Sequence, residues 1–198
     1  MLTDHIYTIT GGSAGFGLSI ARRLLDAGAR VGITGRNQER LEKAAKELGD
    51  QCIALVADVS DSAAVAEAFA AIKEHFGRLD GLINNAGLAY PNAVESLVEA
   101  EVVTQINTNF LGTVLCCQAA IGLLRGGDNP RIINISSASA WHYDEMSHLS
   151  IYAATKAAVE RSSRDLYLEL QGDGIAVTCL RPGAAWTTFS EDWDPAAA

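Results

Sequence analysis

The chain has 198 residues, of which 48% are hydrophobic and 20% are charged, as is typical of one soluble globular domain. Polar residues interrupt every 18-residue window, so we expect no membrane-spanning segment. The net charge of −9 disfavours binding to phosphate backbones and to anionic lipid, so we expect neither nucleic acid nor a membrane as partner. The N-terminus does not resemble a signal peptide, and the four cysteines lie in apolar runs without metal-ligand spacing, which indicates a reduced, cytoplasmic protein.

Short apolar runs alternate with helical patterns from one end of the chain to the other. The runs are uniformly apolar, which predicts strands buried on both faces, at 6–10, 30–34, 52–57, 79–84, 131–136 and 175–181. Helical spacing follows at 41–48, at 65–76 with Ser60 or Asp61 as the cap, and after Ser150 as a further cap. We therefore predict a single domain over 1–198 of the α/β class: a doubly wound (Rossmann-type) parallel sheet of at least six strands with helices on both faces.

A glycine-rich loop, TGGSAGFG at 10–17, follows the first strand and opens the first helix. Gly11 permits a tight turn, and Gly15 and Gly17 remove side chains where a pyrophosphate and the neighbouring strand come close. The helix N-terminus offers free N–H groups to the phosphate. The loop predicts a dinucleotide site, to which we also assign Ser13 and Phe16.

The second strand ends in ITGRNQER, where Gly35 and Arg36 precede the first acid, Glu39. An acid near this point accepts a hydrogen bond from the ribose of NAD, whereas an arginine can face the 2′-phosphate of NADP. The pattern favours NADP (NADPH) over NAD as the cofactor. The alternative is that Arg36 is a solvated arginine at the start of a helix.

Tyr152 and Lys156 are four residues apart in SIYAATKAAVE. On one helix face they lie roughly 6 Å apart. An ammonium group at that distance favours phenolate, so we expect a lowered Tyr152 pKa and a side chain that can exchange a proton with an alcohol.

Seven motifs occur in a characteristic order: TGGSAGFG, ADVSD (57–61), NNAG (84–87), NTNFLG (107–112), NISSASA (134–140), YAATK (152–156) and RPG (181–183). With them the chain resembles the short-chain dehydrogenase/reductase family in its single-domain form. Alone, NNAG could be only a turn and RPG only a strand terminator. Together the motifs cover nearly the whole chain.

The resemblance implies a catalytic group built around the tyrosine. Tyr152 would be the acid/base, and Lys156 would lower its pKa and bond the nicotinamide ribose. Ser137 would hydrogen-bond the substrate oxygen and stabilise developing charge. Ser136 and Ser139 are rivals for that role.

The resemblance also implies residues farther along the cofactor. Asn109 would be the relay residue that holds a water behind the lysine, with Asn107 as its nearest competitor. Cofactor contacts are implied at Asp58 and Val59 for the adenine, at Asn85, Ala86 and Gly87 after the fourth strand, at Pro182, Gly183 and Thr187 beside the nicotinamide, and at Tyr152 and Lys156.

Three departures from the family pattern stand out. Ala14 occupies a position that is basic in many NADP-preferring relatives. The segment after Ser137 carries Trp141, Tyr143 and Met146, which form either a substrate-pocket wall or ordinary surface packing; His142 and His148 there lack a third ligand, so we expect no metal site. The family's final helix and strand do not follow, which would leave Trp186, Phe189 and Trp193 partly uncovered.

The expected function is hydride transfer between NADP(H) and a small carbonyl compound or secondary alcohol. An alternative is a catalytically silent dinucleotide-binding or sensor protein with the same fold; an epimerase or dehydratase ranks below both. The resemblance also implies that the helices at 99–125 and 151–172 pair subunits into a homodimer or homotetramer.

Overall fold

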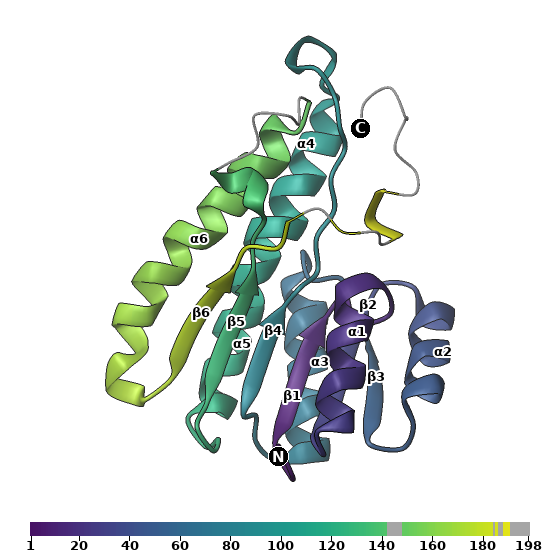
Figure 1. The fold of residues 1–198 in the computed structure, drawn as a ribbon, viewed down its shortest axis with the longest axis vertical. Helices are drawn as coiled ribbons and strands as arrows, with labels where there is room; N and C mark the ends of the chain where they lie inside the picture. The colour runs from purple at the N-terminus through teal and green to yellow at the C-terminus, as the bar shows by residue number, and fades with distance from the viewer. Residues whose placement is uncertain (142–147, 184, 186–187, 191–198) are drawn as a thin grey trace.

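The computed structural model describes residues 1–141, 148–183, 185 and 188–190 (Figure 1). Six strands form one sheet, parallel throughout, in the order β3-β2-β1-β4-β5-β6. They are β1 (Ile6–Thr10), β2 (Arg30–Gly35), β3 (Cys52–Val56), β4 (Gly81–Asn84), β5 (Arg131–Ile135) and β6 (Ala176–Leu180). The predicted doubly wound sheet is confirmed, and each strand ends or begins within one or two residues of its predicted bounds. The predicted burial on both faces is wrong for the outer strand β6, in which every residue is exposed or half-buried, and β3 is only partly buried.

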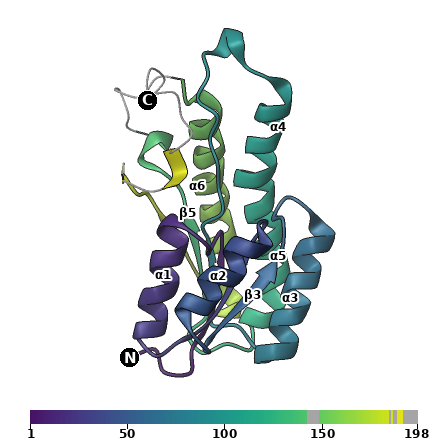
Figure 2. The same ribbon diagram turned by 90° about the vertical axis from the view of Figure 1, so that its right-hand side faces the viewer.

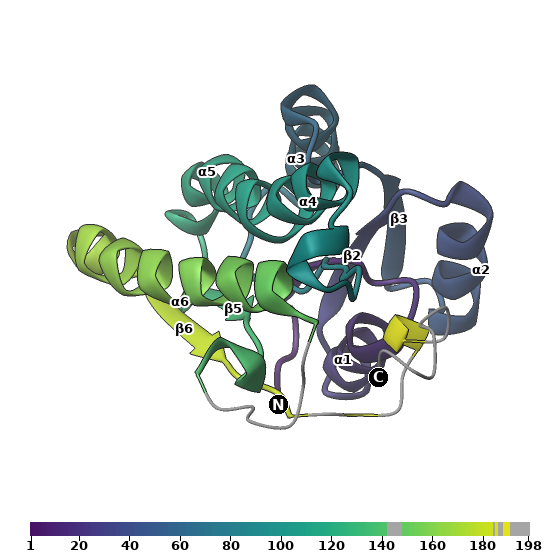
Figure 3. The ribbon, with the colours of Figure 1, turned by 90° about the horizontal axis from the view of Figure 1, so that it is seen from above.

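Helices cover both faces of the sheet, as the view from above shows (Figure 3). On one face lie α3 (Ser62–Phe76), α5 (Gly112–Leu124) and α6 (Ser150–Leu170). On the other lie α1 (Gly15–Asp26) and α2 (Gln38–Leu48). Right-handed crossovers between parallel strands account for this two-layer covering.

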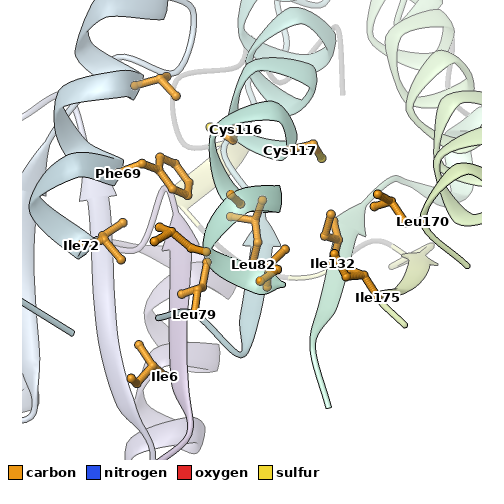
Figure 4. Packing of buried hydrophobic residues seen from close by; sticks show 14 of the residues in the cluster. Ile6, Phe69, Ile72, Leu79, Leu82, Cys116, Cys117, Ile132, Leu170 and Ile175 are labelled. Carbon is orange, nitrogen blue, oxygen red and sulfur yellow. The ribbon is translucent and has the colours of Figure 1, made fainter. Parts of the chain in front are cut away.

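Each face of the sheet carries its own hydrophobic cluster. Figure 4 shows the larger one, where three helices meet the strands through Phe69, Ile72, Cys116, Cys117, Leu170, Leu82 and Ile132. Full burial of such a side chain stabilises the fold by roughly 1.5–3 kcal/mol. The two clusters therefore hold the strands and the helices in fixed positions relative to one another.

The helix starts test the predicted caps. The Asp61 carboxylate accepts hydrogen bonds from the N–H groups of Ala63 and Ala64 at 2.8 and 3.3 Å, so Asp61 rather than Ser60 caps α3. The prediction for Ser150 is wrong, because Leu149 is the N-cap and α6 already begins at Ser150. The chain turns into this helix one residue earlier than the sequence suggested.

A single turn of π-helix, Asn107–Leu111, joins α4 (Glu99–Ile106) to α5 without a break. The continuous stretch Glu99–Leu124 has 26 residues and a window of mean hydropathy 1.3, of which 39% is buried. Among the described residues it is the one helix whose length and composition would suffice to cross a membrane, which the sequence analysis did not anticipate. Its two halves pack on α6, α3 and β4, and a single helix of this kind is weak evidence for a membrane span.

Two helices reach past the sheet toward the same side. Figures 1 and 2 show α4 and the first half of α6 extending beyond the carboxyl ends of the strands. In a doubly wound sheet, ligands bind at this edge. The fold therefore brings the start of α6, with Tyr152 and Lys156, to that edge.

Candidate active site

A cleft runs along the carboxyl edge of the sheet, where the strand order reverses between β1 and β4. Two adjoining pockets of about 250 and 530 Å³ form it and share Gly11, Arg36, Arg40, Ala86 and Gly87. The first extends toward β2 and β3, and the second toward the start of α6. Most predicted site residues line the cleft: Gly11, Ser13, Gly15, Phe16, Arg36, Asp58, Val59, Asn85, Ala86, Gly87, Tyr152 and Lys156.

The glycine loop forms the floor of the cleft between its two ends. Gly11 and Gly15 have φ angles of +66° and +51°, in the left-handed region that favours glycine. A Cβ atom on Gly17 would lie 2.2 Å from the carbonyl oxygen of Gly11, so only glycine fits beneath the loop. At the N-cap of α1, Ala14 offers no side-chain oxygen, and the first N–H groups of the helix stay available to an anionic group. A dinucleotide pyrophosphate fits this arrangement.

Asn85 ties the glycine loop to the loop after β4. Its side-chain amide donates hydrogen bonds to the carbonyl oxygens of Thr10 and Gly11 at 3.0 and 3.2 Å. The Thr10 hydroxyl in turn accepts from the N–H groups of Asn85 and Ala86, both at 3.0 Å. The side chain of Asn85 thus fixes the shape of the cleft between the two loops.

At the β2–β3 end of the cleft, a cation and an anion stand side by side. The guanidinium of Arg36 lies 3.9 Å from the carboxylate of Asp58, and these side chains are 58% and 38% exposed. Burial alone would raise the pKa of Asp58, but hydrogen bonds from the hydroxyl and amide of Ser60 and the charge of Arg36 lower it. The carboxylate is therefore ionised at neutral pH and can accept from a nucleotide base.

A second cation, which the sequence analysis missed, also lines the cleft. Asn37 caps α2 by accepting a hydrogen bond from the backbone N–H of Arg40 at 2.8 Å. This cap starts the helix so that Arg40 joins Arg36 along both pockets. No local pattern marks Arg40 in the sequence, because Arg36 lies before the helix and the position of Arg40 depends on how α2 packs.

At the other end of the cleft, Tyr152 and Lys156 meet as their spacing predicted. The Lys156 Nζ atom lies 5.7 Å from the centroid of the Tyr152 ring. It also donates a hydrogen bond to the carbonyl oxygen of Ile135, at the end of β5, at 2.8 Å. Lys156 is only 4% exposed, and burial lowers its pKa to about 8.

The predicted lowering of the Tyr152 pKa is wrong for the protein on its own. Burial raises the pKa of Tyr152 above its ordinary value, although a hydrogen bond with Ser137 opposes the shift. The sequence shows the neighbouring ammonium, which favours phenolate, but not the burial of Tyr152, which makes a phenolate costly. In this structure Tyr152 therefore holds its proton at neutral pH.

Three neighbouring serines were candidates for the substrate contact, and their hydrogen bonds differ. The Ser136 hydroxyl turns away to Glu160 and to the Lys156 carbonyl oxygen at 2.8 and 3.2 Å. The Ser137 side chain is hydrogen-bonded to Tyr152, and its hydroxyl oxygen accepts a hydrogen bond from the Ser139 hydroxyl at 2.9 Å. Of the three, Ser137 is the one hydrogen-bonded to Tyr152, although Ser136 and not Ser137 is among the residues that line the pockets.

Asn109 is fully buried in the π-helical turn behind the cleft. Its amide oxygen accepts from the Leu88 N–H at 2.9 Å, and its amide nitrogen donates to the Leu88 carbonyl oxygen and to Thr155 at 2.8 and 3.1 Å. A Cβ atom on Gly87 would lie 3.3 Å both from the Asn109 amide oxygen and from Lys156 Nζ. Asn109, rather than Asn107, therefore stands beside the lysine. Single π turns occur often at functional sites.

The remaining predicted residues divide into three groups. Pro182 accepts a hydrogen bond from the Ala138 N–H at 2.9 Å, but neither it nor Gly183 is among the residues that line the two pockets. Thr187 lies outside the described residues, as do His142, Tyr143, Met146, Trp186 and Trp193. Phe189 lies with its ring centroid 5.5 Å from that of Tyr152 and walls the cleft. Among the residues that the structure describes, no group of three or more His, Cys, Asp or Glu side chains could hold a metal ion.

Comparison with known proteins agrees with this architecture. The sequence model described as short chain dehydrogenase matches residues 5–198. An uncharacterized oxidoreductase of Staphylococcus saprophyticus is 36% identical over 198 residues, covering 98% of this chain and 83% of its own. Sulfoacetaldehyde reductase 2 of Chromohalobacter salexigens is 39% identical over 192 residues, covering 94% of this chain and 75% of its own.

Solved structures with nicotinamide cofactors have the same fold. A 3-ketoacyl-(acyl-carrier-protein) reductase of Brucella melitensis, complexed with NADH, superposes with a TM-score of 0.91 at 32% identity, over 96% of this chain and 79% of that one. The RhlG/NADP active-site complex of Pseudomonas aeruginosa gives 0.91 at 35% identity, over 99% and 79%. The fold, the cleft and these matches agree: the chain belongs to the short-chain dehydrogenase/reductase family of oxidoreductases.

Proposed function

We propose that the protein transfers a hydride between NADP(H) and a small carbonyl compound or secondary alcohol. The observation that carries the proposal is that Tyr152 and buried Lys156 line one end of the cleft and that Ser137 is hydrogen-bonded to Tyr152. A bound nicotinamide would supply the hydride chemistry, and the protein supplies position and proton transfer.

The side chains of the site divide the proton work among them. Because burial raises the pKa of Tyr152, its hydroxyl keeps a proton that it can donate to a carbonyl oxygen. Ser137 holds that oxygen and steadies the developing negative charge. Lys156, with a pKa of about 8, can return a proton to the tyrosine near physiological pH. In the oxidation direction the same groups act in reverse.

The charge pattern at the β2–β3 end supports NADP rather than NAD. Arg36 and Arg40 both line the cleft there, and Gly35 stands where an acid would accept from the NAD ribose. Asp58, held by Ser60, remains available to the adenine. Arg40 supplies the second positive charge that Ala14 does not.

The walls near Tyr152 favour an uncharged substrate. Apart from Lys156, and from Arg36 and Arg40 on the side of β2, the described residues that line this pocket carry no charge; among them are Leu88, Ala89, Tyr90, Pro91, Ile135, Ser136 and Phe189. An apolar wall rewards apolar substituents on the carbonyl compound. We therefore expect 2,3-butanedione and ethyl acetoacetate to be better substrates than sulfoacetaldehyde, the anionic aldehyde in one relative's name.

The test follows NADPH absorbance with these three carbonyl compounds. Tyr152→Phe should lower turnover by about 10²–10⁴-fold while NADPH still binds, because it removes the proton donor and little else. Tyr167→Phe, an exposed tyrosine on the same helix, is the matched control and should leave turnover unchanged. Near-normal reduction by Tyr152→Phe would contradict the proposed role. NADPH binding without any reduction by the wild type would favour a dinucleotide sensor.

We also propose that α4 and α5 pair with a second copy of the chain. Large apolar side chains are exposed along 94–114: Val94, Val98, Val103, Ile106, Leu111 and Val114. Light scattering should give a mass at least twice the 20.9 kDa of one chain. Val103→Glu should lower that mass, whereas Val56→Glu, exposed at the end of β3, should not. A monomeric wild type would contradict the pairing.

A further inference from the structure

Glu160 is a buried carboxylate directly behind the catalytic group. It lies on α6 four residues after Lys156 and eight after Tyr152, and only 7% of its side chain is exposed. The carboxylate accepts hydrogen bonds from the Ser136 hydroxyl at 2.8 Å and from two nitrogens of Arg181 at 2.7 and 2.6 Å. The indole N–H of Trp141 donates to it as well.

The carboxylate stays charged in this position. Burial by itself would raise the pKa of Glu160, but the hydrogen bonds from Arg181, Ser136 and Trp141 and the charge of Arg181 lower it. Four donors around one buried carboxylate satisfy its oxygens, which is the condition under which a buried ion is tolerated. A charge-assisted set of this kind fixes geometry more firmly than neutral hydrogen bonds do.

The partners of Glu160 come from three separate segments that border the cleft. Ser136 immediately precedes Ser137 at the end of β5, and its N–H donates to the Leu180 carbonyl oxygen at 2.7 Å. Arg181 follows β6, and Trp141 follows the short 3₁₀ turn Ala138–Ala140. Glu160 therefore joins the helix that carries the tyrosine to the strand end that carries the serine.

We propose that Glu160 is a positioning residue, which sets where Ser137 stands relative to Tyr152. The inference rests on the proposed hydride-transfer function. Stability alone is a weaker explanation, because replacing a buried ion pair by apolar residues is often neutral for folding. In contrast, a misplacement of about 1 Å at a reacting group can lower the rate about a hundredfold.

Glu160→Gln keeps the shape and removes the charge, and Glu160→Ala removes all four contacts. On whichever of the three carbonyl probes the wild type reduces, we expect kcat to fall about 10- to 100-fold in Glu160→Ala and less in Glu160→Gln. The KM for NADPH should change much less, and the primary deuterium isotope effect from C4-deuterated NADPH should grow, because hydride transfer becomes slower. The matched control is Asp173→Ala, which breaks the Arg125–Asp173 ion pair, made by the Arg125 Nε and Nη2 atoms at 3.1 and 2.9 Å, at the opposite edge of the sheet. It should change none of these quantities.

A purely structural role predicts a different result. Glu160→Gln and Glu160→Ala would then unfold at lower temperature while kcat and the isotope effect stayed at wild-type values, and that outcome would overturn the inference. Amide hydrogen exchange provides a readout without turnover: Glu160→Gln should speed exchange across 136–141 and leave 171–176 unchanged. Unaltered exchange at 136–141 would also overturn it. A wild type inactive on all three probes would count against the proposed function alone.

Discussion

The two ends of the cleft differ in how far water reaches them. At the β2–β3 end, Arg36 and Asp58 face solvent as a loose ion pair, whereas Lys156 at the other end is almost completely buried. Exposed charges interact weakly and are screened by salt, so a charge contact at the first end would change the free energy of cofactor binding only modestly. Burial shifts pKa values strongly, and the proposed proton transfer takes place at the second end. One cleft thus combines an exposed end with a buried one.

The largest expected effect comes from removing the buried charge. The pKa of Lys156 is about 8 in the folded protein against an ordinary 10.5, so the unfolded chain holds the extra proton between these values. As the pH rises through this window, the buried Lys156 side chain becomes neutral and its burial no longer costs free energy. The unfolding free energy of the wild type should therefore rise by up to about 3 kcal/mol relative to that of Lys156→Met. Urea titrations of both proteins at several pH values measure this difference. Lys43→Met, on the exposed surface of α2, is the control, and a pH-independent difference for Lys156→Met would show that the ammonium is not desolvated.

The loop that joins the two ends should be the next most sensitive. In Gly17→Ala the new methyl group would meet the Gly11 carbonyl oxygen, and the loop must shift. Overpacking of this kind costs about 1–3 kcal/mol, so we expect NADPH affinity to fall about 10- to 100-fold in fluorescence titrations. Gly122→Ala, on α5, meets nothing within 4 Å and should bind as the wild type does. Unchanged affinity in Gly17→Ala would mean that the loop does not hold the cofactor.

The exposed end should give the smallest effect and the most selective one. Arg36→Asp should weaken NADPH binding about tenfold while leaving NADH binding nearly unchanged, because a charge-assisted hydrogen bond to phosphate contributes roughly 1.5–3 kcal/mol before screening by salt. Binding at two salt concentrations checks the electrostatic origin. Arg22→Asp makes the same charge change on α1, outside the cleft. An equal loss of both cofactors in Arg36→Asp would remove the 2′-phosphate role.

Local patterns predicted most of the fold. The inner strands were evident because a strand buried on both faces is a continuous apolar run, whereas the equally apolar outer strands β3 and β6 are partly exposed. The glycine loop was evident because left-handed φ angles and close contacts leave few other residues possible. Helical spacing placed Tyr152 and Lys156 on one face, and the resemblance of the seven motifs to a known family identified them as a catalytic pair. In each case the determining interaction spans only a few residues of sequence.

What the sequence did not predict depends on contacts between distant segments. The raised pKa of Tyr152 reflects burial by the whole fold. Glu160 looks like an ordinary surface acid of a helix until Arg181 and Ser136 are brought to it from other strands. Arg40 lines the cleft only because α2 packs so that Arg40 reaches the same pocket as the glycine loop.

The π turn at Asn107–Leu111 has a consequence for how the long helix serves two neighbours. One additional residue in a helical turn rotates everything after it by about 100° relative to everything before it. The extra residue therefore sets the angle between the face of α4 that contacts α6 and the face of α5 that contacts α3. Deleting a single residue within this turn would rotate α5 relative to α4, so the long helix could keep its contacts with only one of these two neighbours.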